Sequence, residues 1–449
     1  MYGKKPVDHP LGWLVAFGSF LVQFSVFGAM NSFTIFLDSM MNDETLSYPS
    51  QTTLSLGSSI SMGLASVFGM VGGVLADRIH PKVLLSFAMA GIYAALLMSS
   101  YFAKSGIGVS LFFALPISLS AGMTMIPTAA ATSTWFEKHR ATAIGIVYAG
   151  GGCGSVVFPL FCGPFLGKYG WRSTFRILTL LVSSGVIGTL LVEKRSLPSQ
   201  EVNEEELIVG STMVTSFMGQ RTFRNSHLKP KEVLKFIFAR IFVASFVCQI
   251  FYSFAFYAAI YVCVPLALAM GKDGTVYQDE APIDPGAAGR LITWFGIAQT
   301  IGSFSGGLIS AHFGSEAVFC LCCSVTGIGF CFLALATTYI ELLIALMVLA
   351  LFASATLSTY SSILAHIFYG ANLGTSMSLV FLGGCVSGFA GPPILSAMQG
   401  ATNGDYTYGC ILTSGFAVAA AYICYFLQWK DNYEVMTLNN DESTSLENI

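Results

Sequence analysis

Long apolar segments alternate with short polar ones along almost the whole chain. Twelve of the apolar segments are long enough for a helix that crosses the hydrocarbon core of a bilayer, which takes about 20 residues. We therefore predict an all-α membrane protein with twelve transmembrane helices. The expected spans are residues 11–36, 51–76, 83–102, 107–134, 141–166, 173–193, 236–264, 287–311, 317–338, 341–366, 373–398 and 406–428.

The composition agrees with a lipid environment. Hydrophobic residues make up 54% of the 449 residues, charged residues only 10%, and the mean hydropathy is +0.69. This leaves too little polar surface for a soluble globule of this size. The first apolar run lacks a small-residue cleavage signal, so we expect it to be a retained span. The sequence contains no basic, aromatic-interleaved patch for nucleic acid, and no Cys, His and carboxylate spacing that would hold a metal.

An internal repeat divides the chain into two similar parts. The glycine-rich segment from Gly150 to Pro159 returns from Gly384 to Pro393, at an offset of 234 residues. Parallel repeats in a very apolar chain are typical of transporters built from two six-helix halves around a pseudo-twofold axis along the membrane normal. We expect an N-terminal half at 1–193, a cytosolic linker at 194–235, a C-terminal half at 236–428 and a polar, disordered cytosolic tail at 429–449.

Basic residues predict the orientation in the membrane. Most of them fall in the loops on one side of the predicted spans, together with the linker and both ends of the chain. Because loops rich in Lys and Arg stay in the cytosol, we expect both termini to be cytosolic. The plasma membrane is the expected location, and membrane lipid and a single-span escort protein are candidate partners.

A small set of polar side chains inside the spans could contact a solute. The candidates are Asn31, Tyr257, Tyr261, Gln299, Ser303, Ser358 and Ser362. Each has a structural alternative, because amides join helices, hydroxyls bond to carbonyls of their own helix, and aromatic stripes fill cores. His366 continues the stripe of Ser358 and Ser362 and is the candidate proton site, since an ionisable group inside a span is a functional candidate by default.

The second span ends in a motif with a clear electrostatic problem. Asp77 lies at a helix C-terminus, where the macrodipole disfavours a carboxylate, so it needs a cation or another helix N-terminus beside it. The segment from Gly73 to Lys82 resembles the loop signature of the major facilitator superfamily, except that His80 stands where Gly is usual. The resemblance implies the major facilitator fold and a latch between the two halves, formed here by Asp77, Arg78 and Arg140.

The fifth span narrows the resemblance. The segment from Trp135 to Gly150 is similar to the signature of the monocarboxylate transporter family, which is related to the oxalate/formate antiporters. In lactate carriers of that family a Lys in span one and an Asp/Arg pair in span eight bind the carboxylate and the coupled proton. Asn31, Gln299 and Ser303 occupy those positions here. An uncharged cavity suits a neutral or zwitterionic solute, because a buried carboxylate would lack its cation.

Two functions follow from these patterns. The first is a monocarboxylate-transporter-like secondary carrier that moves a small organic solute by alternating access, either by symport with a proton or as an uncoupled facilitator of a neutral or aromatic solute. The second is a non-transporting sensor on the same fold. An enzyme is not expected, because the sequence has no nucleophile elbow, metal-ligand spacing or phosphate loop, and no cofactor is implied.

Overall fold

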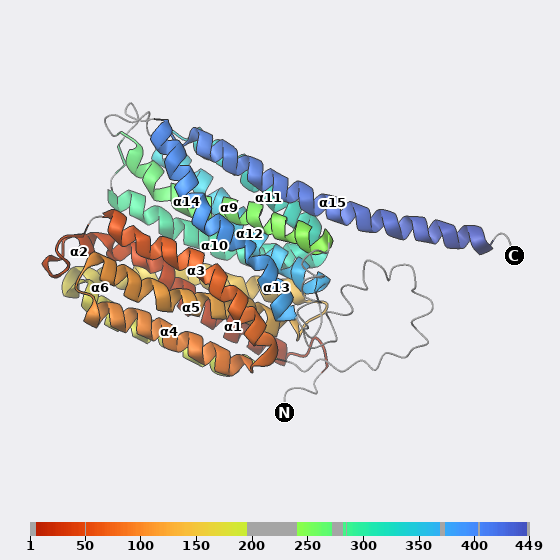
Figure 1. The fold of residues 1–449 in the computed structure, drawn as a ribbon, viewed down its shortest axis with the longest axis horizontal. Coiled ribbons are helices and arrows are strands. Elements are labelled where there is room, and N and C mark those ends of the chain that lie inside the picture. Colours follow the sequence, from red (N-terminus) through yellow and green to blue (C-terminus); the bar gives the residue numbers. More distant parts are fainter. Residues whose placement is uncertain are drawn as a thin grey trace.

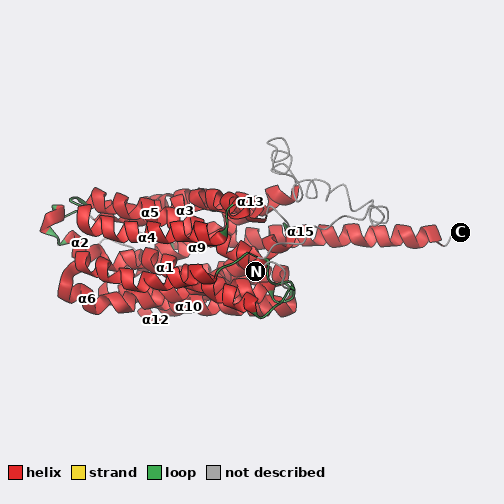
Figure 2. Ribbon diagram, turned by 90° about the horizontal axis from the view of Figure 1, so that it is seen from below, coloured by secondary structure: helices red, strands yellow, loops and turns green. Residues whose placement is uncertain are grey.

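The computed structural model shows a bundle of long helices (Figures 1 and 2). It describes residues 6–49, 51–194, 240–271, 282–283, 285–368, 373–402 and 405–446, and no strand occurs among them. The N-terminal half contains α1 (Leu11–Asn31), α3 (Gln51–Arg78), α4 (Pro81–Phe102), α5 (Gly106–Ser133) and α6 (Arg140–Leu191). The C-terminal half contains α9 (Arg240–Ala269), α10 (Pro285–Phe313), α11 (Ser315–Ala334), α12 (Tyr339–Ile367), α13 (Leu373–Phe381), α14 (Gly383–Ala401) and α15 (Thr407–Leu446). Between α1 and α3 lie the short helices η1 (Ser32–Phe36), α2 (Leu37–Met41) and η2 (Glu44–Leu46).

The helices agree with the twelve predicted spans. Ten of the described helices are long and apolar enough to cross a membrane. One of these, α6, is two helices joined at Gly170, whose φ of 71° and ψ of 171° interrupt the helical backbone. The helix α10 covers the predicted eighth span, and α13 and α14 together cover the eleventh, with a break at Leu382. The protein is therefore an all-α membrane protein with two six-helix halves.

Two boundaries differ from the predictions. The first α-helix ends at Asn31 and continues only as a 3-10 turn to Phe36. At the other end of the chain, α15 remains helical to Leu446, where we expected a disordered tail. No Gly or Pro follows Gly415 in the sequence, so nothing there breaks the helix once it has begun. The predicted linker at 194–235 lies outside the described residues, apart from Lys194.

The start of α1 and the end of α15 lie toward the same end of the bundle (Figures 1 and 2). We call this end, where α1 begins and α3 ends, the terminal face. In Figure 1 the N-terminal half, coloured red to yellow, lies beside the C-terminal half, coloured green to blue. One hydrophobic cluster draws only on the N-terminal half and a second only on the C-terminal half. A third contains residues of both, such as Ile144 and Phe381, so the halves share an apolar contact.

Small residues set the distances between neighbouring helices. In the N-terminal half, a Cβ on Gly28 of α1 would lie 3.0 Å from the Cα of Gly154 on α6. Between the halves, a Cβ on Gly145 of α6 would lie 2.9 Å from the Cα of Gly307 on α10. Backbones this close exclude any larger side chain. These glycines thus bring α6 against both α1 and α10.

Candidate solute site and the contacts that close it

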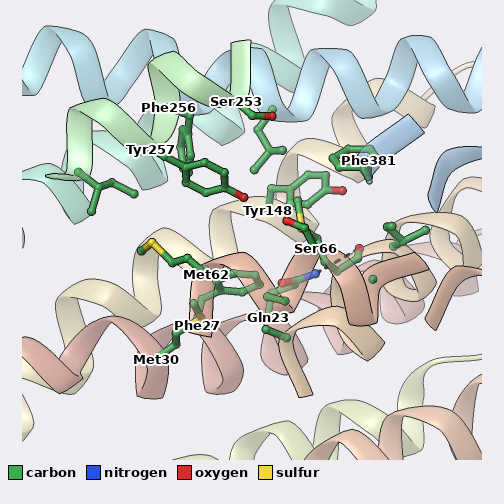
Figure 3. Close-up of a pocket in the computed structure, with 18 of the residues that line it drawn as sticks. Gln23, Phe27, Met30, Met62, Ser66, Tyr148, Ser253, Phe256, Tyr257 and Phe381 are labelled. Atoms are coloured by element: carbon green, nitrogen blue, oxygen red, sulfur yellow. Dashed lines mark hydrogen bonds between the residues drawn. The ribbon is translucent and has the colours of Figure 1, made fainter. Parts of the chain in front are cut away.

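A cavity lies midway along the helices, between the two halves (Figure 3). The empty space in it amounts to about 1000 Å³, including the part that is continuous with solvent. In Figure 3, Phe256 and Tyr257 of α9 face Gln23, Phe27 and Met62 of the N-terminal half. The described residues of the lining are Gln23, Phe27, Met30, Asn31, Met62, Ala65, Ser66, Gly69, Ala121, Met125, Ile126, Tyr148, Gly151, Gln249, Tyr252, Ser253, Phe256, Tyr257, Ile260, Gln299, Leu357 and Phe381.

The lining is aromatic and amide-rich, and it is uncharged. Its described residues include no Asp, Glu, His, Lys or Arg. They do include six aromatic rings, three methionines and four side-chain amides. Aromatic rings stack on planar solutes, methionine adapts to irregular shapes, and amides supply both donors and acceptors. This arrangement can bind a neutral, planar solute with polar groups at its edges.

Three of the residues expected from the sequence lie in this lining: Asn31, Tyr257 and Gln299. Asn31 also donates from Nδ2 to the hydroxyl of Ser155 at 2.7 Å, which ties α1 to α6. Asn31 therefore both joins two helices and lines the cavity, which are the two roles that the sequence left open. Tyr257 reaches toward Ser66 of α3, so the two side chains face each other across the halves.

The other expected solute contacts lie outside the lining. Ser303 is buried where α10 meets Gly145 of α6. Ser358 donates to the carbonyl of Ala355 in its own helix at 3.0 Å.

Ser362 and Tyr261 also serve packing inside the C-terminal half. Ser362 accepts from Ser315 of α11 at 3.2 Å, and Tyr261 packs against the hydrophobic cluster of that half. For all four, the local packing role that the sequence offered as the alternative describes the observed contacts. His366 is exposed in the last turn of α12, at the terminal face and away from the cavity.

Several lining residues are not among those expected from the sequence. Phe27 stands one helical turn and Gln23 two helical turns before Asn31, and a step of four residues places all three on one face of α1. This spacing in the sequence could have identified Gln23 and Phe27 as neighbours of Asn31 on the same helix face. Gln23 is 1% exposed and donates from Nε2 to Thr128 of α5 at 2.8 Å.

Gln249 has an unusual environment among the lining residues. Its side chain is 2% exposed, and its Nε2 donates to the hydroxyl of Ser253, one turn further along α9, at 2.8 Å. Its Oε1 has no hydrogen-bond partner among the described residues. Tyr252 lies beside the amide, but no hydrogen bond of normal geometry joins its phenol to that oxygen. A buried acceptor left without a partner costs about 1–3 kcal/mol.

On the terminal side of the cavity, Asp77 joins the two halves. Its carboxylate accepts from the backbone N–H of Gly374 at 3.1 Å and of Thr375 at 2.7 Å, and from the Thr375 hydroxyl at 2.8 Å. These groups belong to the first turn of α13, so Asp77, at the end of α3, caps a helix of the other half. Lys194 lies 3.5 Å away. Asp77 therefore has both a helix N-terminus and a cation beside it, where the sequence led us to expect one or the other.

Arg140 makes a second contact between the halves on the same face. Its NH1 donates to the carbonyl of Ala365 near the end of α12 at 3.5 Å, and its Nε donates to Phe136 at 3.1 Å. A cation near a helix C-terminus is favoured for the same reason that a carboxylate is favoured at an N-terminus. Arg78, the third residue expected in the latch, is exposed. Asp77 and Arg140 thus each make a contact between the two halves at the terminal face.

Comparison with known proteins adds independent findings. The model of the Major Facilitator Superfamily matches residues 15–278 and 264–443. Riboflavin transporter RibJ of Trypanosoma cruzi is 36% identical over 453 residues, covering 96% of each chain. The protein of the same name in Trypanosoma brucei brucei is 28% identical over 524 residues, again covering 96% of each.

Solved structures share the fold at low sequence identity. The proton:xylose symporter XylE, bound to 6-bromo-6-deoxy-D-glucose, superposes with a TM-score of 0.67 at 14% identity, covering 92% of this chain and 94% of that one. FucP in the outward conformation superposes with a TM-score of 0.62 at 14% identity, covering 92% of this chain and 99% of that one.

Proposed function

Because the chain belongs to the major facilitator superfamily and is a membrane transporter, we propose that it carries riboflavin, or a closely similar flavin, across a membrane by alternating access. The observation that carries this proposal is the uncharged, aromatic cavity between the halves. It agrees with the names of the two relatives that cover almost the whole chain. The proposal does not depend on the solved structures, because at 14% sequence identity they support the fold alone.

The chemistry of a flavin suits this lining. The flavin ring system is flat, aromatic and uncharged at neutral pH, with carbonyl and N–H groups along one edge, and riboflavin adds a chain of hydroxyl groups. Rings such as Phe27, Phe256 and Phe381 offer stacking surfaces, while amides such as Asn31 and Gln299 can bond to hydroxyls. A monocarboxylate, the solute implied by the family resemblance, would enter a described lining without a cation to offset its desolvation.

Transport would proceed by rocking of the two halves. In the present conformation Asp77 and Arg140 close the terminal face, so the cavity would next be reached from that side only after these contacts separate. We place the terminal face in the cytosol, because the sequence has most of its basic residues in the loops, linker and chain ends expected on this side. The plasma membrane is the proposed location, since a carrier for an external nutrient acts there.

We further propose that transport is uncoupled from protons. No Asp, Glu or His lies in the described lining, and His366 lies at the terminal face. A coupled proton needs a group that titrates as the solute binds. Facilitated movement down the solute gradient needs none.

Uptake into proteoliposomes tests the proposal. Vesicles containing the purified full chain should take up tritiated riboflavin, with saturation and with acceleration by unlabelled riboflavin inside. Labelled lactate in parallel vesicles should enter no faster than into empty ones. Lactate flux without riboflavin flux would replace the proposal by a monocarboxylate carrier. Absence of flux for both, with correct folding shown by gel filtration, would favour the sensor.

A further inference from the structure

Polar groups from two other helices surround Gly384 of α14, and the amide of Gln249 is one of them. A Cβ on Gly384 of α14 would lie 3.4 Å from Gln249 Nε2, 3.4 Å from the Ser66 hydroxyl of α3 and 3.5 Å from the Ser253 hydroxyl of α9. Polar atoms of both halves therefore converge beside the backbone of α14. In the same amide, the Gln249 carbonyl oxygen is buried and has no partner among the described residues.

The amide is oriented before any solute arrives. Ser253 accepts from Nε2 at 2.8 Å, and the neighbouring Gly383, where a Cβ would lie 3.2 Å from Gln249 Cγ, confines the side chain. Two other lining amides are oriented in the same way, because Gln23 donates to Thr128 and Asn31 to Ser155 within the N-terminal half, but among these three described amides Gln249 is the one with a buried oxygen that lacks a partner. Gln249 thus offers a fixed acceptor that the protein itself leaves unmatched.

We propose that the Oε1 of Gln249 accepts a hydrogen bond from a ring N–H of the transported solute, and thereby selects heterocycles with an unsubstituted imide or lactam edge. This inference rests on the proposed flavin transport and specifies its selectivity. In a flavin the donor is the imide N–H between the two ring carbonyls. A solute that supplies this proton satisfies a buried acceptor, whereas an analogue methylated at that nitrogen leaves it bare and adds a methyl group against it.

Discrimination of this kind is strong, because an analogue without the N–H leaves a buried acceptor of the protein without a hydrogen bond. A site that is built to bond a substrate N–H rejects analogues that lack it more effectively than an apolar pocket rejects a change in size. For one buried acceptor, the loss corresponds to about a 5- to 150-fold weaker interaction. Ser253 acts as a positioning residue, since it sets the direction of the amide.

Competition for riboflavin uptake tests the inference. Proteoliposomes with the full chain take up tritiated riboflavin in the presence of either unlabelled riboflavin or N3-methylriboflavin. In the wild type, the methylated compound should inhibit at least about fivefold less strongly. Gln249→Met, which keeps the length of the side chain but not the acceptor, should bring the two inhibition constants together. Ser253→Ala should reduce the difference in part. Gln299→Leu alters a lining amide on α10 and should leave the difference intact, even if uptake itself slows.

The outcomes separate the two proposals. No riboflavin uptake by the wild type would overturn the flavin carrier itself. Uptake with equal inhibition by both compounds would leave the carrier standing and overturn the role of Gln249. Retained discrimination in Gln249→Met would also overturn that role. If Gln249→Met fails to fold, as judged by gel filtration, Ser253→Ala decides, because unchanged discrimination there contradicts a positioned acceptor.

Discussion

Replacing Asp77 by Asn should loosen the closure at the terminal face. In the wild type the carboxylate caps α13 through two backbone N–H groups and the Thr375 hydroxyl. Asparagine keeps one acceptor oxygen but loses the charge and the second oxygen. Capping contributes about 0.5–2 kcal/mol, and a charge at a helix N-terminus about 0.3–1 kcal/mol. We therefore expect a loss of about 1–2 kcal/mol from the closed state.

The ion pair with Lys194 should contribute less than the cap. Its atoms are 3.5 Å apart and the lysine side chain is 27% exposed, so its contribution should lie within about 0–1 kcal/mol. Lys194→Gln is therefore the matched control for the charge interaction. Arg78→Gln is a second control, because Arg78 is exposed beside the same carboxylate.

Cysteine labelling measures the closure directly. Ser378 is fully buried on α13, against Gly73 of α3, so a cysteine in its place can react with a polar maleimide only when the halves separate. The labelling rate of this cysteine, followed by mass spectrometry of the peptide that contains it, reports the fraction of molecules that are open at the terminal face. In the Ser378→Cys background, Asp77→Asn should raise this rate by about 5–30-fold, and both controls by much less. Equal increases for Asp77→Asn and Lys194→Gln would refute the capping argument, and no increase for either would refute the latch.

Three further predictions concern other parts of the molecule. Gly145→Ala should slow transport severely at normal expression, because the new Cβ would lie 2.8 Å from the Ser303 carbonyl and oppose closure by about 1–3 kcal/mol. Gly163→Ala, on the same helix with nothing within 4 Å, should be harmless. Riboflavin uptake should be unaffected by a proton gradient or an ionophore, since no carboxylate or histidine lies in the described lining; accumulation driven by the gradient would contradict this. Burial raises the pKa of Asp43, but hydrogen bonds from Thr45 and Trp171 outweigh it and hold the pKa below its usual 3.8. Asp43 should therefore stabilise the fold above pH 3.8 and cease to do so as the pH falls through the lowered pKa. The difference in melting temperature between wild type and Asp43→Asn should then disappear in acid. A difference that persists in acid would contradict a stabilising role of the ionised carboxylate.

Much of the architecture was accessible from the sequence because it depends on lengths and on small residues. A span must be long and apolar to cross a bilayer, so twelve spans could be read along the chain without any knowledge of their neighbours. The glycines that repeat at one offset mark close helix contacts, and Gly150 and Gly154 do meet the backbone of α1. The macrodipole argument likewise showed that Asp77 needs a partner.

Only the tertiary structure decided which partner Asp77 has and which polar helix faces line the cavity. Helical periodicity tells that Ser358 and Ser362 share a face, but not that this face meets α10 and α11 inside one half. The same periodicity could not place Gln23 and Gln249, from α1 and α9, around one space. The physical reason is that each half has polar contacts of its own, so a polar stripe becomes part of a site only when the packing of twelve helices turns it toward the other half.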